Sequence, residues 1–98
     1  MPRFSAKEIK IKLKAVFWDN DISADELYEI YMGRKKNAGS VNRVIIYTRL
    51  LNTYDWYTLL KIVPPQKWKE MLSDNVLAVI FPKSLKNKYF HVRRLLFE

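Results

Sequence analysis

The chain has 98 residues, enough for one domain, and its hydrophobic share of 49% is ample for a core and too high for a disordered protein. Its net charge of +8 favours anionic partners, either nucleic acid or an acidic protein face. Alternatively, the charge serves only to keep the surface solvated and the protein in solution. The chain has no cysteine, no apolar run near the roughly 20 residues of a membrane span, and no signal-peptide stretch at its N-terminus, so we expect a cytoplasmic protein with no membrane partner.

The first predicted helix follows Ser5. Ser5 and Glu8 have the spacing of a capping box, which marks a helix start. Apolar residues then recur at helical spacing, at Ile9, Leu13, Val16 and Phe17. Residues 9–15 also alternate between apolar residues and lysine, as a strand does. Because lysine, leucine and alanine favour helices, we expect a helix here.

The second and third helices are expected on either side of a basic loop. Residues 19–21 (Asp-Asn-Asp) form a break, and Ser23 with Glu26 predicts a capped helix over roughly 24–33. Residues 33–39 predict its C-cap and the basic loop, after which Ser40 is expected to cap the third helix. The apolar stripe of that helix consists of Val41, Val44, Ile45, Thr48 and Leu51. Three further residues widen this apolar face, so we expect it to be the most buried helix: Ile46, Tyr47 and Leu50.

The C-terminal half predicts further short helices. Thr53 or Asp55 begins a fourth, and the pair at 64–65 (Pro-Pro) ends it and begins a fifth. Residues 76–81 are an apolar run that fits either a buried helical turn or a strand, and a proline ends it. Ser84 is then expected to cap a last helix. Its inward side would consist of Leu85, Tyr89, Val92 and Leu96.

These elements predict an all-α fold, a single irregular bundle of five or six short helices spanning residues 1–98. Pairing of residues 9–15 with residues 76–81 would add a minor two-stranded element. We expect one hydrophobic core. Its predicted members are Val44, Ile45, Leu51, Trp56, Leu59, Leu60, Trp68 and Leu72.

The excess positive charge lies at the two ends of the chain. The basic N-terminal segment (1–15) and the basic C-terminal helix (82–98) each hold five basic residues and one acidic residue, whereas the segment between them is neutral. Basic and aromatic residues alternate over 86–94, which suits phosphate contact and base stacking but equally fits an inward aromatic face. The candidate nucleic-acid-binding residues are Lys83, Lys86, Lys88, Arg93 and Arg94.

Residues suited to catalysis are few. His91 is the only histidine and has no cysteine or second histidine with which to share a metal, so neither a zinc site nor a Ser-His-Asp triad is expected. The two glycines form no phosphate-binding loop, which argues against a nucleotide cofactor. Asp19 and Asp21 fit a turn better than a two-carboxylate metal site. We therefore expect a protein that is not an enzyme and has no metal and no cofactor.

Trp18 is the candidate partner-binding residue. Trp56 and Trp68 lie on predicted apolar stripes, whereas Trp18 lies at a helix end beside a turn, where it either closes the bundle or anchors a partner. Basic residues on the preceding helix would steer an acidic partner toward this anchor. The candidates are Lys10, Lys12 and Lys14. A helix-turn-helix over 54–74 is disfavoured, because its second helix offers poor phosphate-binding chemistry.

Three stretches together resemble a family of small, uncharacterised bacterial helical proteins. They are residues 16–21 (VFWDND), residues 43–45 (RVI), and residues 55–61 (DWYTLLK) leading into 68–72 (WKEML). The family pattern is a Phe-Trp-Asp near the start, an Arg-Val-Leu core helix, an Asp-Trp-x-x-Leu helix and an aromatic C-terminal segment. The resemblance covers about residues 16–97. The chain departs from the pattern at the basic loop and around residues 82–88.

Members of that family often lie beside genes for nucleotidyltransferase toxins of the abortive-infection type. The resemblance therefore implies an antitoxin-like or accessory partner role and passes on no catalytic residue. The leading prediction is a small non-catalytic interaction module whose partner is another protein, such as a nucleotidyltransferase-type toxin. The alternative is a nucleic-acid-binding module that uses the basic ends.

Overall fold

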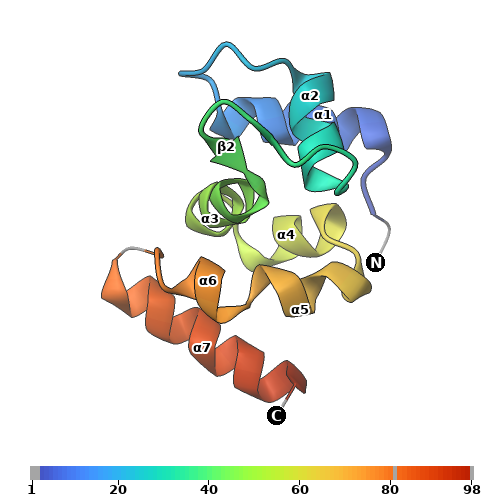
Figure 1. The fold of residues 1–98 in the computed structure, drawn as a ribbon. Helices are drawn as coiled ribbons and strands as arrows, with labels where there is room; N and C mark the ends of the chain where they lie inside the picture. The colour runs from blue at the N-terminus through green and yellow to red at the C-terminus, as the bar shows by residue number, and fades with distance from the viewer. Residues whose placement is uncertain (1–2, 81, 98) are drawn as a thin grey trace.

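The structure, a computed structural model, describes residues 3–80 and 82–97, and these are mainly helical (Figure 1). The longer helices are α1 (Ala6–Val16), α2 (Ala24–Tyr31), α3 (Arg43–Thr53), α4 (Trp56–Ile62) and α7 (Lys83–Phe97). The short elements are β1 (Asn37–Ala38), β2 (Val41–Asn42), the 3-10 turn η1 (Pro65–Lys67), α5 (Trp68–Met71) and α6 (Asp74–Leu77). The predicted all-α class with a minor two-stranded element is confirmed.

The two strands lie elsewhere than the alternating pattern suggested. Residues 9–15 belong to α1, and the apolar run that begins at Val76 starts as the second half of α6. The antiparallel ladder instead pairs β1 with β2 inside the basic loop that follows α2. Gly39 lies between the strands with φ +60°, a left-handed conformation that glycine adopts without strain. A tight turn at this glycine therefore decides where the ladder forms.

Three predicted helix starts are confirmed and two are wrong. Ser5 forms the full capping box with Glu8, Ser23 caps α2, and the Asp55 side chain caps α4. The cap of α3 is Asn42 rather than Ser40, because residues up to 42 are used by the ladder. Ser84 lies inside the first turn of α7, which already begins at Lys83 directly after the helix-limiting proline.

A single hydrophobic cluster links α1 to α7. Of the predicted core residues, Leu51, Leu59, Trp68 and Leu72 are buried. The other four are partly buried and pack against the cluster: Val44, Ile45, Trp56 and Leu60. The predicted apolar face of α3 is too broad, because Val44, Ile45 and Thr48 in it are only partly buried. The buried face of α3 consists of Ile46, Tyr47, Leu50 and Leu51.

Buried tyrosines join helices that are distant in the sequence. The Tyr31 hydroxyl donates a hydrogen bond to the Ile62 carbonyl at 3.1 Å, and burial raises the pKa of this phenol. The Tyr89 hydroxyl donates to the Leu51 carbonyl at 3.2 Å, which attaches α7 to the end of α3. Because buried polar groups are costly without partners, these bonds fix the relative positions of the helices as well as satisfying the hydroxyls.

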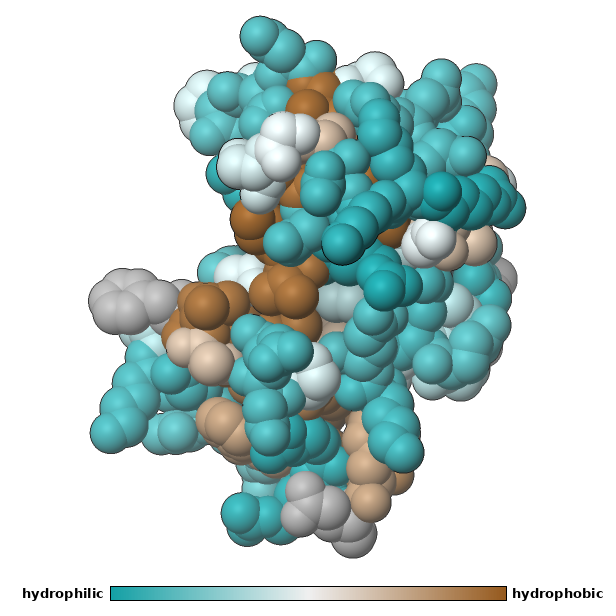
Figure 2. Space-filling model, in the orientation of Figure 1, coloured by the Kyte–Doolittle hydropathy of each residue, from teal (hydrophilic) through white to brown (hydrophobic). Residues whose placement is uncertain are grey.

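Figure 1 shows how the helices are distributed in space. Helices α1 and α2 pack together at one end, α3 crosses the middle, and α7 lies at the other end beneath α5 and α6. The face in Figure 2 is mostly hydrophilic, with apolar atoms gathered in an indentation between the two ends. Among the described residues, no helix combines the length and the apolar character required to cross a membrane.

Helix α7 is attached to the body by residues between Leu85 and Arg93. Tyr89 is its only buried residue among those described, while Leu85 and Val92 are partly buried beside the core. Leu96 was expected on the same inward side but is 49% exposed. The reason is local: the last turn of α7 borders an open hollow beside Trp56 and Trp68 rather than a closed core.

Candidate protein-binding loop at Trp18

Trp18 is the most exposed large hydrophobic side chain among the described residues. Its side chain is 81% exposed and lies in the turn that follows α1. The neighbouring Phe17 is completely buried, so the chain places one aromatic ring in the core and the next one in solvent. An indole this exposed contributes little to the core, and this favours the anchor over the bundle-closing alternative.

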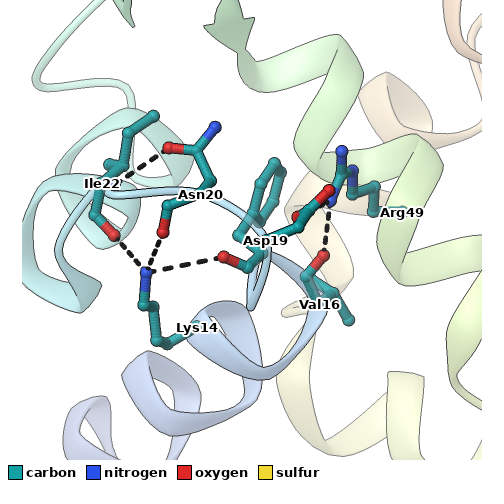
Figure 3. A network of polar contacts seen from close by, with 7 residues as sticks. Lys14, Val16, Asp19, Asn20, Ile22 and Arg49 are labelled. Atoms are coloured by element: carbon teal, nitrogen blue, oxygen red, sulfur yellow. Dashed lines mark hydrogen bonds and ion pairs between the residues drawn. The ribbon is translucent and has the colours of Figure 1, made fainter.

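The turn after α1 is held from one side by Lys14 (Figure 3). The Lys14 ammonium donates hydrogen bonds to the carbonyl oxygens of Asn20 at 2.6 Å and Ile22 at 2.8 Å, with a longer contact of 3.5 Å to the Phe17 carbonyl. The Ile22 N–H donates to the Asn20 side-chain oxygen at 2.9 Å. One lysine thus contacts three carbonyl oxygens of the turn, and the hydrogen bond to the Asn20 side chain, of the Asx-turn type, stabilises the turn further.

Arg49 on α3 holds the turn from the other side (Figure 3). Its guanidinium donates to the Val16 carbonyl at 2.8 Å and to the Asp19 carboxylate at 3.0 Å, and it lies 4.4 Å from the centre of the Phe17 ring. The hydrogen bond from Arg49 holds the pKa of the Asp19 carboxyl below its ordinary value. Asp19 is therefore occupied by an arginine rather than placed for a metal.

These contacts make the turn a rigid support for Trp18. Both residues that flank the indole are fixed, Phe17 by burial and Asp19 by the Arg49 guanidinium. Ile11 and Ala15 are exposed on the face of α1 that leads to the turn, and Ile11 is 59% exposed. These two residues therefore form a short apolar strip on α1, the helix that precedes the Trp18 turn. Sequence reasoning found Trp18 but missed Arg49, which has no signal near the turn, and missed Ile11, which the helical spacing could have revealed.

The three lysines predicted to steer a partner all have contacts within the molecule. Lys10 forms an ion pair with Asp25 at 2.9 Å, and this hydrogen bond raises the pKa of the lysine. Lys12 lies over the rings of Phe4 and Tyr54, at 5.6 and 5.5 Å from their centres. Lys14 belongs to the turn network. Lys14 thus has a structural task that the sequence did not suggest, and steering by these lysines stays a prediction.

The five basic residues predicted to bind nucleic acid divide into two groups on α7. Arg93 points toward the body, where its guanidinium donates to the Asp74 carboxylate at 2.6 Å and to the Leu72 carbonyl. Lys86 likewise donates to the Ala78 carbonyl at 3.2 Å. The remaining three form no ion pair or hydrogen bond with any residue that the structure describes, and all are exposed: Lys83, Lys88 and Arg94. The structure therefore divides the five predicted residues into two that bond to the body and three whose side chains are exposed.

The described residues contain no group of three or more His, Cys, Asp and Glu side chains that could hold a metal ion. His91 is exposed on the outer face of α7. The Tyr47 hydroxyl donates a hydrogen bond to the Glu70 carboxylate at 2.8 Å, and Arg43 pairs with the same carboxylate at 3.3 Å. These contacts connect α3 to α5.

Comparison with known proteins does not assign the chain to a family. No protein-family model, no curated protein and no solved structure matches this chain.

Proposed function

We propose that this protein is a non-catalytic module that binds another protein, with Trp18 as the anchor. The observation that carries the proposal is the 81% exposure of Trp18 on a turn fixed by Lys14 and Arg49. A tryptophan exposed to water gains contact area when a partner covers it, and tryptophan is enriched among the residues that dominate binding energy. Because the turn is already ordered, binding costs little conformational entropy.

The apolar strip next to the anchor supports the same function. Ile11 and Ala15 are exposed apolar residues on the helix that precedes Trp18, and charged residues such as Lys7 and Glu8 lie beside them on α1. Protein interfaces have this pattern of an apolar centre and a polar rim. The net charge of +8 favours a partner with an acidic face, since complementary charge accelerates association.

A nucleotidyltransferase-type toxin is the partner class that we propose on the family resemblance. The role would be antitoxin-like or accessory: the module binds the toxin and holds it in check. The structure supports only the binding half of this proposal, through the anchor. Inhibition requires that the bound module cover or distort a site on the toxin.

The test is capture of a partner from the native host by tagged protein, followed by binding kinetics on the captured protein. We expect a nucleotidyltransferase among the proteins that co-purify, and we expect Trp18→Ala to lose it. Tyr57→Ala is the matched control, because Tyr57 is another exposed aromatic residue, 66% exposed, on α4. Equal capture by Trp18→Ala and the unchanged protein would remove Trp18 as the anchor.

The kinetic measurement separates anchor from steering charge. Truncation of a buried anchor costs about 2 kcal/mol or more, roughly a thirtyfold weakening, which appears mainly in the dissociation rate. Charge reversal at Lys10, Lys12 and Lys14 would slow association if they steer. Because Lys14 also supports the turn, Lys10→Glu with Lys12→Glu is the cleaner variant for steering.

A second candidate function, nucleic-acid binding, is favoured by one observation on α7. Lys83, Lys88 and Arg94 share the exposed side of this helix with Asn87 and His91. Cations on the open side of a helix can contact phosphates, with polar side chains beside them available for base edges. Figure 1 places α7 at the opposite end of the molecule from the turn after α1, so this surface is separate from the anchor.

The second function is tested by fluorescence anisotropy on a duplex and on a single strand at about 50 mM salt. Three phosphate contacts would give a slope of log K against log salt of about −2.7 on the duplex and about −2.1 on the single strand, and replacing Lys83, Lys88 and Arg94 by alanine should remove it. The control variant removes the same charge elsewhere, at Lys7, Lys36 and Lys69, which are also exposed. Equal weakening in both variants would indicate only a general effect of net charge.

A further inference from the structure

A hollow of about 410 Å³ lies between α4, the η1–α5 segment and the last turn of α7. Its volume falls within the range of about 300–1,000 Å³ that is typical of small-molecule sites. Trp56 and Trp68 form one wall, with their ring centres 5.1 Å apart and the planes inclined by 44°. Leu60 and Val63 continue the apolar surface. Apolar surface thus dominates the hollow.

The inner part of the hollow is preformed by the fold. Trp68 is 5% exposed and Val63 is almost completely buried, so both are fixed by the core. The two prolines at 64–65 end α4 and direct the chain into η1, which places the two tryptophans side by side. The outer edge is open, because Leu96 and Phe97 on the last turn of α7 remain partly exposed. Such a site needs no rearrangement to accept an apolar group.

Arg3 is the only charged side chain among the described residues that line this hollow. Its segment is anchored next to α4, because the Phe4 N–H donates a hydrogen bond to the Lys61 carbonyl at 2.9 Å. A guanidinium presents a planar set of donors that matches a carboxylate. The hollow therefore joins an apolar interior to one cationic group at its edge.

We propose that this hollow is a binding site for a small apolar carboxylate, such as a medium-chain fatty acid. The hydrocarbon chain would lie against Trp56, Leu60 and Trp68, and the carboxylate would pair with Arg3. The charge of the described lining favours an anionic ligand, because the Arg3 guanidinium attracts a carboxylate and repels a cation. This site is separate from the Trp18 turn and does not depend on the function proposed above.

The test is a titration of the full chain with octanoate, and a second titration with the neutral analogue 1-octanol. Both are monitored through the indole N–H signals of the three tryptophans in NMR spectra. We expect octanoate to shift the Trp56 and Trp68 signals to saturation and to leave Trp18 unchanged. Arg3→Gln should weaken octanoate binding about tenfold or more and leave 1-octanol unaffected, since only the charge-assisted bond is lost. Lys7→Gln, which removes an exposed charge outside the hollow, should change neither.

A second pair of variants tests the site without disturbing the core. Leu96→Glu places a negative charge in the hollow at a residue that is already half exposed. Because this charge repels the octanoate carboxylate, the substitution should abolish octanoate binding. Leu95→Glu adds the same charge one residue away, at a side chain that is 71% exposed and does not line the hollow, and it should leave binding almost unchanged.

Three results would overturn the proposal. The first is equal octanoate affinity in the unchanged protein and Arg3→Gln. The second is a shift that rises without saturating or that affects Trp18 as strongly as Trp56 and Trp68, which indicates an adventitious additive only. The third is binding of an apolar peptide with a free C-terminal carboxylate in the absence of octanoate binding, which would make the hollow a peptide site.

Discussion

Lys14→Met removes the ammonium that holds the turn after α1 while keeping a long apolar side chain that suits a helix. The two shorter hydrogen bonds, 2.6 Å to the Asn20 carbonyl and 2.8 Å to the Ile22 carbonyl, are lost together. Hydrogen bonds that involve a charged group contribute about 1.5–3 kcal/mol each when water is excluded. Lys14 is half-buried and water can reach the freed carbonyls, so we expect a loss of about 2 kcal/mol in the free energy of unfolding for the pair.

The assay is urea unfolding followed by circular dichroism, with a thermal melt as a second measurement. A loss of about 2 kcal/mol corresponds to a fall in Tm of about 8–16 °C for a domain of this size. Lys7→Met is the control, because it makes the same substitution at an exposed position of the same helix. Equal losses in both variants, or a loss below about 0.5 kcal/mol for Lys14→Met, would refute the structural role of Lys14.

Three further predictions concern the anchor, the α3–α5 contact and acid stability. Trp18→Ala should change the free energy of unfolding by no more than about 0.5 kcal/mol in the same urea assay, since the indole is mostly in water; a large loss would mean that Trp18 is a core residue. Tyr47→Phe should lower the free energy of unfolding by about 1 kcal/mol through loss of the hydrogen bond to Glu70. In a double-mutant cycle, the loss caused by Tyr47→Phe should be smaller in the Glu70→Gln background, and additive losses would contradict the contact. Hydrogen bonds from Thr58 hold the pKa of the Asp55 carboxyl below its ordinary value. The charge of Asp55 therefore stabilises the fold above a pH of about 4, and this contribution is lost as the pH falls through the lowered pKa of Asp55. Asp55→Asn keeps a capping oxygen without the charge, so its urea midpoint should fall below that of the unchanged protein near neutral pH and converge with it in acid; a constant difference would contradict the assignment.

Features determined by neighbouring residues could be predicted from the sequence. The caps at Ser5, Ser23 and Asp55 are confirmed because each side chain bonds a backbone N–H only three residues away. The predicted cap at Ser40 is wrong because Val41 and Asn42, which would begin that helix, pair with β1 instead, and this pairing depends on the turn at Gly39. Local spacing does not contain that information.

The orientation of α3 could not be predicted for a different reason. Apolar residues occur on nearly every side of this helix, so periodicity alone does not indicate which side faces the core. The observed face includes Ile46 and Tyr47, and it is selected by contacts with α1, α2 and α6 that only the complete fold provides. The same limit applies to the candidate site, because Arg49 reaches Asp19 across 30 positions of the chain.

The two basic ends of the chain carry equal formal charge, and in the folded protein one ion pair offsets part of that charge at each end. At the N-terminal end, Asp25 offsets the charge of Lys10, and Lys14 faces backbone carbonyls of the turn. On α7, Lys83 and Arg94 have no acidic neighbour within hydrogen-bonding or ion-pair distance among the described residues. Long-range attraction depends on charge that is not offset nearby. Asp74 offsets the charge of Arg93 as Asp25 offsets that of Lys10, so both ends contribute to the attraction. An acidic partner anchored at Trp18 would therefore be attracted partly by a helix at the far end of the molecule, and its association rate should depend on salt even though the anchor itself is apolar.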